Sequence, residues 1–364
     1  METTQQDCLA ALLARIGPAD EAARAEAARR WAACAKPLGS LGLLETALED
    51  IAALTGSADI ALQPREVLVF CADNGVVAQG VAQSDSSVTR IVTRNLAVHN
   101  TSVCQMAAAA HCTVVPVDMG VEDFPATPGV LDRRIANGTA DMTQGPAMSR
   151  EQAAQGILTG IELVRQHKEA GVRLFATGEM GIGNTTTASA VACVLLGQPV
   201  EAMTGRGAGL SDEGLRRKKA AIAKALAVNA PDPADPLGVL AAVGGFDIAG
   251  MCGAFLGGAL YGVPVLADGV ISAVAALLAV RLCPAAAKAI LASHVSAEPA
   301  GHLLLAALDK KPLITAGMRL GEGTGAVAAM PLLDMALAVY AGCYTFSESG
   351  IPTYLPLGGE DAAL

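Results

Sequence analysis

The chain has 364 residues, enough for about two domains of ordinary size. Hydrophobic residues make up 52% of it and charged residues 16%, a composition that excludes an intrinsically disordered protein. The net charge of −10 argues against nucleic acid and anionic membranes as partners, because an acidic surface repels phosphate groups.

The predicted elements alternate between helices and strands along most of the chain. We expect helices at 1–33 (broken at Pro18), 41–54, 88–110, 150–171, 188–196, 211–228, 250–261, 272–282 and 330–346. We expect strands at 66–72, 111–117, 173–177, 264–267 and 312–315. The segment 287–292 fits either a helix end or a strand, and 122–150 fits a long surface excursion.

Several of these strands end in a polar, glycine-containing turn that opens a helix. This pattern predicts an α/β fold with a mostly parallel, Rossmann-like sheet and flanking helices. Ligands of such sheets bind at the carboxyl ends of the strands. The first helices and the last one have no strand nearby, so we expect a small helical subdomain from 1–60 and 330–364, and a large α/β domain at 61–329 that carries the active site.

Cysteine and histidine spacing predicts neither a disulfide framework nor a metal centre. The nine cysteines include no C-x-x-C pair and the five histidines no H-x-x-x-H pair. The N-terminus is polar and contains Asp7, which is unlike a signal peptide. We therefore expect a cytoplasmic protein with reduced thiols.

One stretch, 248–267, is uncharged for about the length of a transmembrane helix. Its five glycines and Pro264 weaken a lipid-facing helix, and Asp247 and Asp268 flank it closely. No cluster of Lys or Arg beside it sets an orientation. A buried helix that runs into a buried strand is the better interpretation.

The run GEMGIGNTTT at 178–187 follows a predicted strand and opens a helix. Glycines let the backbone approach a ligand, and a helix N-terminus favours anions. Glu179 is a candidate acid or base within this loop. The run matches neither the dinucleotide fingerprint nor a Walker loop, and a tight turn capped by threonines is the structural alternative.

Two further glycine-rich loops carry charged residues. The loop GRGAG at 205–209 suits a phosphate or a ribose, and the four cations at 216–219 that follow it are either a solvated helix face or a source of one phosphate ligand. In GMRLGEGTG at 317–325, Glu322 lies between two glycines, so a planar ligand has room beside its carboxylate. Arg319 offers a planar fork for a phosphate or carboxylate, although a loop with one surface salt bridge remains the alternative.

The run 293–302 holds His294, Glu298 and His302, but Pro299 interrupts the helix that would align them as metal ligands. Core or capping histidines are the better interpretation, and the hydroxyl of Ser296 suits an anion. Neither a Ser-His-Asp order nor G-x-S-x-G occurs. The candidate catalytic groups are therefore carboxylates.

Six motifs occur in a recognisable order: KPLGSLG at 36–42, ADNGV at 72–76, GEMGIGNTT at 178–186, TGRGAG at 204–209, SHVSAE at 293–298 and GMRLGEGTG at 317–325. Together they resemble the nicotinate-nucleotide–dimethylbenzimidazole phosphoribosyltransferases, a family of cobamide synthesis. The resemblance covers residues 30–352. It implies transfer of the phosphoribosyl group of nicotinate mononucleotide to a benzimidazole-type or phenolic base, with release of nicotinate and inversion at the anomeric carbon.

The resemblance also implies a parallel-sheet domain, a small helical domain, a homodimer or a heterodimer with a paralogue, and no metal or cofactor. It makes Glu322 the general base and Glu179 a second carboxylate near the ribose. We expect the phosphate and ribose to be bound by Gly181, Gly183, Asn184, Gly207, Gly209, Lys218, Ser296 and Arg319. We expect the base pocket to include Ser84, Val92, Met180 and Leu320.

Three positions depart from the family pattern: Asn74 replaces a histidine, Asp85 replaces a proline and Val92 replaces a glutamine. All three fall in the segment expected to shape the base pocket. Loss of a polar partner weakens selection for an azole nitrogen, so we hypothesise a shifted base choice, with an unusual benzimidazole, a purine or a phenol as the acceptor.

Two rival functions stay open. The chain could be a partner-dependent subunit of a heterodimer, and the retention of Glu179, Arg319 and Glu322 argues only against an inactive one. A nicotinamide-dependent dehydrogenase is disfavoured by the missing fingerprint.

Overall fold

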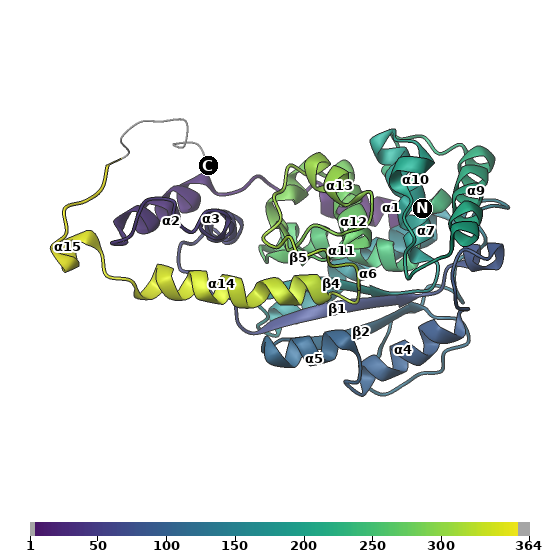
Figure 1. The fold of residues 1–364 in the computed structure, drawn as a ribbon, viewed down its shortest axis with the longest axis horizontal. Helices are drawn as coiled ribbons and strands as arrows, with labels where there is room; N and C mark the ends of the chain where they lie inside the picture. The colour runs from purple at the N-terminus through teal and green to yellow at the C-terminus, as the bar shows by residue number, and fades with distance from the viewer. Residues whose placement is uncertain (1–3, 356–364) are drawn as a thin grey trace.

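The computed structural model describes residues 4–355 and contains a six-stranded, all-parallel sheet (Figure 1). The strands are β1 (Arg65–Ala72), β2 (Thr113–Gly120), β3 (Leu131–Asp132), β4 (Leu174–Met180), β5 (Val265–Ala267) and β6 (Ile290–Ala292). Their order is β3-β2-β1-β4-β5-β6, so the winding reverses between β1 and β4. This is the doubly wound, Rossmann-like architecture that the alternation of strands and helices predicts.

The helices are α1 (Gln5–Leu13), α2 (Glu21–Ala33), α3 (Leu43–Thr55), α4 (Ser87–Ala97), α5 (Ser102–Ala109), α6 (Arg150–Glu169), α7 (Asn184–Leu196), α8 (Val200–Met203), α9 (Asp212–Asn229), α10 (Pro236–Val243), α11 (Phe246–Tyr261), α12 (Val270–Leu282), α13 (Gly301–Ala307), α14 (Thr324–Gly342) and α15 (Phe346–Ser349). Short 3₁₀ helices span Gly75–Gln79 and Pro284–Ala289.

The two faces of the sheet belong to separate apolar cores. Side chains alternate along β1, so Leu68 and Phe70 pack into the core with α6, α11 and α12, whereas Val67 and Val69 pack into the core with α3, α5 and α14. Both sets are fully buried. The sheet is therefore covered on both sides, as parallel sheets usually are (Figure 1).

Glycines let α6 and α11 pack closely. A Cβ atom on Gly160 would overlap the carbonyl oxygen of Gly250, and one on Gly253 would overlap that of Ile157. The uncharged stretch 248–267 is thus most of α11 followed by β5, and the interpretation as a buried helix running into a buried strand is confirmed.

Among residues 4–355, one helix, α14, is long and apolar enough to cross a membrane by length and composition alone. Its first half packs into the core through Ala326, Val327 and Met330. It begins six residues earlier than expected, because residue 324 already follows the glycine-rich loop, and it accommodates Pro331.

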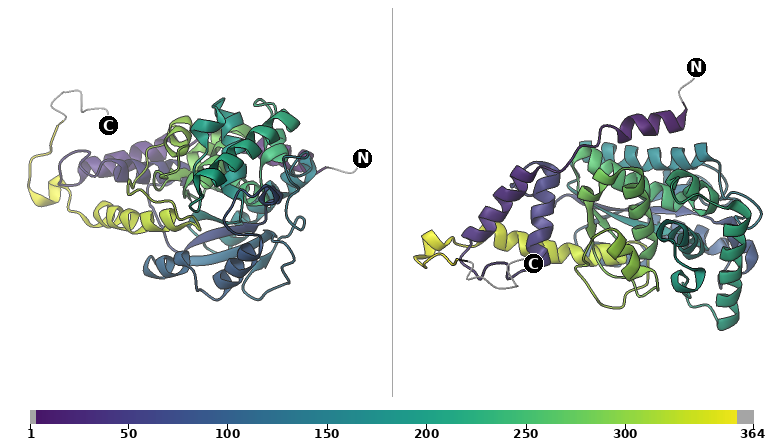
Figure 2. Two further views of the ribbon diagram at one scale, coloured as in Figure 1. Left: turned by 45° about the vertical axis from the view of Figure 1, so that its right-hand side comes forward. Right: turned by 90° about the horizontal axis from the view of Figure 1, so that it is seen from above.

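The elements assigned to a small helical subdomain lie in two places. Helices α2 and α3 pack against α14, with the rings of Trp31 and Tyr340 4.9 Å apart. Helix α1 instead lies along α6, where the backbone N–H of Gln5 donates to Glu151 (Figure 2, right). The division at residues 60 and 330 stays a prediction.

Several local predictions are wrong. The helix expected at 88–110 is two helices, α4 and α5, interrupted at residues 98–101, where His99 has a φ of 57°. The strand expected at 312–315 is only an isolated bridge between Ile314 and His294. Helices α8, α10 and α13 were not expected, because each is short and lacks a clear amphipathic period.

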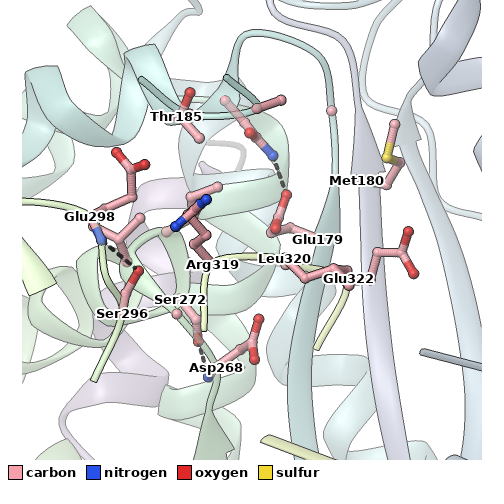
Figure 3. Close-up of a pocket in the computed structure, with 18 of the residues that line it drawn as sticks. Glu179, Met180, Thr185, Asp268, Ser272, Ser296, Glu298, Arg319, Leu320 and Glu322 are labelled. Carbon is pink, nitrogen blue, oxygen red and sulfur yellow. Dashed lines mark hydrogen bonds between the residues drawn. The ribbon is translucent and has the colours of Figure 1, made fainter. Parts of the chain in front are cut away.

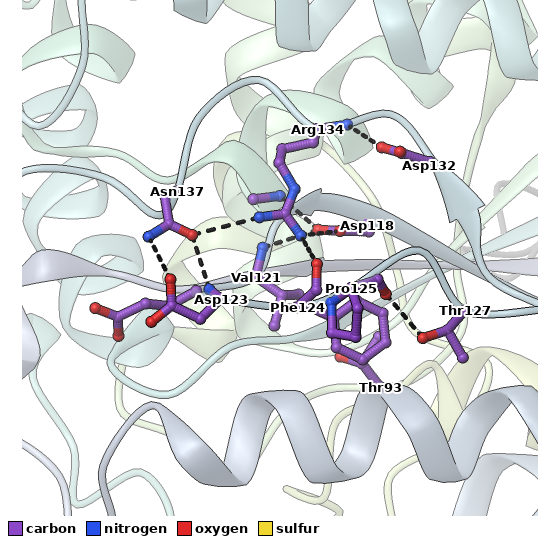
Figure 4. A network of polar contacts seen from close by, with 12 residues as sticks. Thr93, Asp118, Val121, Asp123, Phe124, Pro125, Thr127, Asp132, Arg134 and Asn137 are labelled. Atoms are coloured by element: carbon purple, nitrogen blue, oxygen red, sulfur yellow. Dashed lines mark hydrogen bonds and ion pairs between the residues drawn. The ribbon is translucent and has the colours of Figure 1, made fainter.

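The excursion at 122–150 is ordered by a polar network at its base (Figure 4). Asp118 accepts hydrogen bonds from the backbone of Gly120 and Val121 and pairs with Arg134 at 2.7 Å. Arg134 also donates to the carbonyl of Phe124. These contacts hold the chain close to the carboxyl end of β2.

Candidate active site

A cavity of about 280 Å³ opens at the carboxyl ends of β4, β5 and β6, beside the point where the strand order reverses (Figure 3). Parallel strands bring the turns that follow them to one edge of the sheet. The loops after these three strands, together with the loop before α14, therefore enclose one space.

Glu179 lies near the end of β4 and lines the cavity, although only 9% of it is exposed. Burial raises the pKa of its carboxyl group well above the usual range, and the nearby carboxylates of Asp247 and Asp268 raise it further. Opposing this, Asn184 donates a hydrogen bond to Glu179 from its side-chain amide.

Glu322 comes from the loop before α14, which is built of consecutive left-handed residues. Gly321, Glu322 and Gly323 have φ values of 92°, 61° and 92°. The Glu322 carboxylate accepts a hydrogen bond of 3.1 Å from the backbone N–H of Val103 in the first turn of α5. One free amide at the N-terminus of α5 thus holds this carboxylate.

Asp268, which was not predicted to be a site residue, fixes that loop. Its carboxylate follows β5 and accepts backbone hydrogen bonds from Gly323, Gly325 and Ala326 at 3.2, 2.7 and 3.1 Å. It therefore caps α14 from another element. The signal in the sequence was an Asp-Gly pair directly after a predicted strand.

Close packing brings the two carboxylate loops together. A Cβ atom on Gly321 would lie 2.5 Å from Oε1 of Glu179, and one on Gly178 would overlap the carbonyl oxygen of Glu322. Glycine is therefore required at both positions for Glu179 and Glu322 to face one cavity.

Lys218 is the buried cation of this region. It is fully buried on α9, and its Nζ donates to the Thr185 hydroxyl at 2.8 Å. Burial lowers the pKa of Lys218 to about 8, opposed by the charge of Glu298. A Cβ atom on Gly207 would lie 3.5 Å from this Nζ, so the amine lies directly behind the cavity wall.

Its neighbours on α9 do not share this position. Arg217 pairs with Glu213 on the surface, Arg216 is exposed and Lys219 is half-buried. Of the four cations at 216–219, Lys218 is thus the one that α9 directs inward.

Most of the predicted site residues line the cavity: Val92, Glu179, Met180, Gly181, Asn184, Gly207, Ser296, Arg319, Leu320 and Glu322. Gly183, Gly209 and Ser84 do not line it, and Lys218 lies behind Thr185. The lining residues that sequence reasoning missed are Ile182, Thr185, Ala208, Asp268, Gly269, Val270, Ile271, Ser272, His294, Glu298 and Gly321. Those at 268–272 follow β5, whose turn carried no recognised motif, and the others lie within the named motifs but were not singled out.

The three departures from the family pattern occupy different places. Asn74 is buried beneath the β4–α7 loop, where its amide donates to the carbonyls of Ala72 and Ile182 at 3.4 Å. Asp85 accepts hydrogen bonds from Ser87 at the start of α4. Of the three, Val92 lines the cavity, and Asn74 and Asp85 do not. That all three shape the base pocket stays a prediction.

The chain matches known proteins over nearly its whole length. A family model described as a phosphoribosyltransferase matches residues 16–351. A nicotinate-nucleotide–dimethylbenzimidazole phosphoribosyltransferase of Ruminiclostridium cellulolyticum is 47% identical over 88% of this chain and 92% of that protein. The relative of the same name from Clostridium acetobutylicum is 44% identical over the same shares.

Solved structures agree with the sequence matches. A crystal structure of the enzyme of that name from Thermus thermophilus superposes with a TM-score of 0.85 at 41% identity, covering 92% of this chain and 99% of that chain. A second crystal structure from the same organism gives a TM-score of 0.87. The chain belongs to the nicotinate-nucleotide–dimethylbenzimidazole phosphoribosyltransferase family.

Proposed function

We propose that the cavity transfers the 5-phosphoribosyl group of nicotinate mononucleotide to an aromatic lower-ligand base and releases nicotinate, for cobamide synthesis. The observation that carries this proposal is the meeting of Glu179 and Glu322, from separate elements, in one cavity that also exposes Arg319. The names of the relatives supply the two substrates.

The reaction requires no proton donor for the leaving group, since the pyridinium ring departs as a neutral ring that keeps the electron pair of the broken bond. Positive charge develops on the ribose carbon, and the buried Glu179 carboxylate stabilises it. The azole nitrogen of the incoming base acquires positive charge as it attacks. Glu322 removes the azole proton and prevents that charge from accumulating.

We assign the phosphate to the end of the cavity formed by Gly207, Ser296 and Arg319. Lys218, directly behind the Gly207 loop, adds a positive charge there. Met180, Leu320 and Val92 supply apolar surface, and we assign the acceptor base to them.

The direct test is nicotinate release by the purified chain alone, from nicotinate mononucleotide with dimethylbenzimidazole. We expect release together with formation of the base riboside phosphate. No release with any acceptor would contradict a self-sufficient enzyme and favour the partner-dependent subunit, to be checked by adding a paralogous chain.

Val92 favours a second proposal, that the acceptor is not dimethylbenzimidazole alone. An apolar side chain lines the cavity where the family pattern has a glutamine, so one polar contact to an azole nitrogen is missing. We expect adenine or phenols to compete with benzimidazoles in kcat/KM, and Val92→Gln to restore preference for the azole. A wide preference for dimethylbenzimidazole in the unmodified chain would refute this.

We further propose that the chain acts as a dimer in the cytoplasm. Two apolar side chains, Met335 in the second half of α14 and Tyr344 just after that helix, are exposed and could form an assembly surface. All nine cysteines are free thiols. Sedimentation of the purified chain tests the assembly, and cell fractionation tests the compartment.

A further inference from the structure

Two buried acidic side chains at the cavity, Glu179 and Asp247, have no cation to pair with among residues 4–355. Asp247, on the first turn of α11, is fully buried and lies outside the cavity lining. No Lys, Arg or His within residues 4–355 forms an ion pair with Asp247 or Glu179. Asn184 donates a hydrogen bond to Glu179, and the nearby carboxylate of Asp247 raises the pKa of Glu179, so the buried residue acts on the one that faces the cavity.

Asp247 also has an unsatisfied atom. Its Oδ1 accepts a hydrogen bond of 2.9 Å from the backbone of Ile248, but Oδ2 is buried without a partner among the described residues. A buried carboxylate oxygen without a donor is strongly unfavourable, whereas a protonated carboxyl group carries no charge to solvate. The orphaned oxygen therefore indicates that this pair of acids holds a proton.

We propose that Asp247 is a positioning residue which, together with Glu179, retains one proton in the free enzyme, and that this proton passes to solvent when a nucleotide with a cationic ring binds beside Glu179. The inference rests on the proposed function, because it takes that nucleotide to be nicotinate mononucleotide. No covalent bond of the substrate changes in this step. The pair, which carries one negative charge while it holds its proton, becomes a dianion, and the pyridinium charge replaces the lost proton.

Other charged groups around Glu179 and Asp247 decide in which direction the pKa values of the pair shift. Asp268, after β5, adds to the negative potential at Glu179, and Asp73, after β1, does so at Asp247. Glu322 and Arg319 face the same cavity from the loop before α14, and Cys71 on β1 is a buried neutral thiol. With these neighbours, burial raises the pKa of Asp247 to about 6 and that of Glu179 well above its usual value. The two titrate as a coupled pair.

The experiment is calorimetric binding of nicotinate mononucleotide without acceptor base, in buffers of different ionisation enthalpy. Ribose 5-phosphate is the reference ligand, because it carries the same phosphate and so cancels the titration of the phosphate and of Lys218. It lacks both the cationic ring and the ring carboxylate, and that carboxylate is ionised throughout this pH range and exchanges no proton. We expect the nucleotide to release more protons than the reference. A plot of log Kd for the nucleotide against pH should bend at the apparent pKa of the acid pair in the free enzyme. Below this inflection the Kd should fall about tenfold for each unit of rising pH, which is the slope expected when binding releases one proton.

Asp247→Asn removes the neighbouring charge and keeps the shape. We expect the inflection to move down by about one pH unit or more, with tighter binding than wild type at low pH and weaker binding at high pH. Asp118→Asn is the matched control, a buried carboxylate at the same sheet edge that is paired with Arg134, and it should leave the inflection in place. A general loss of structure cannot produce a crossing of the two curves.

Equal proton release by nucleotide and reference, or an unmoved inflection in Asp247→Asn, would overturn the inference. If Asp247→Asn does not fold, Glu179→Gln serves as the second variant and should abolish the ring-dependent proton release. Proton release that persists in Glu179→Gln would also overturn the inference. If the nucleotide releases more protons than the reference but no nicotinate is formed with any acceptor, the proposed function alone is refuted. If nicotinate is formed but the extra proton release is absent, only this inference is refuted. Failure of the nucleotide to bind would refute both.

Discussion

In the proposed chemistry the carboxylate of Glu322 alone accepts the proton, and one backbone amide of α5 holds this carboxylate in place. We expect Glu322→Gln to lower kcat/KM about 10²-fold or more, because the amide cannot accept the azole proton. Nicotinate release measured under steady-state conditions checks this. Glu201→Gln, on the exposed surface of α8, should keep normal turnover, and near-normal turnover by Glu322→Gln would remove that residue from the role.

Lys218 gives the phosphate end a pH dependence of its own. Burial lowers its pKa to about 8, so the free enzyme loses this charge as the pH rises through that value. A bound phosphate favours the charged amine, and affinity is therefore full below pH 8 and declines above it. Ribose 5-phosphate binding between about pH 7 and 9.5 should show this decline, and Lys218→Met should bind more weakly with a flat profile.

At the scale of elements, Asp268 connects β5 to the loop that presents Glu322. Asp268→Ala removes three backbone acceptor contacts and should lower the free energy of unfolding by about 1–3 kcal/mol. Turnover should fall by more than the loss of folded protein accounts for, because the loop that presents Glu322 loses the hydrogen bonds that fix it. Urea unfolding and nicotinate release measure the two effects, and Asp268→Asn, which keeps one oxygen, should fall between the wild type and the alanine variant.

The contact between α6 and α11 requires glycine because the two backbones approach too closely for a Cβ atom, as the two carboxylate loops do at the cavity. Gly160→Ala places a methyl group where the Gly250 carbonyl lies, so we expect a loss of about 1–3 kcal/mol or more in the free energy of unfolding. Gly145→Ala, which meets nothing within 4 Å, is the control and should be near neutral. A stable Gly160→Ala protein would show that the two helices can separate at little cost.

At the scale of the whole molecule, the sequence predicted the sheet because each apolar run ends in a polar turn. It predicted Glu179 and Glu322 because both lie in glycine-rich loops. It did not reveal the role of Asp268, since an Asp-Gly pair after a strand does not say which backbone groups, 55 residues further along the chain, its carboxylate binds. It gave no sign that Asn74 is buried beneath the β4–α7 loop, because the burial of a turn residue depends on the loop that covers it.

The left-handed backbone at Glu322 has a consequence for how the enzyme can change. A glutamate in this conformation raises the free energy of the folded state by about 1–3 kcal/mol relative to a relaxed backbone. The active loop is therefore a place where folding and catalysis make opposite demands on one residue. Selection for thermal resistance would favour glycine at residue 322, because glycine adopts this conformation without strain, and would yield more stable proteins that no longer turn over substrate.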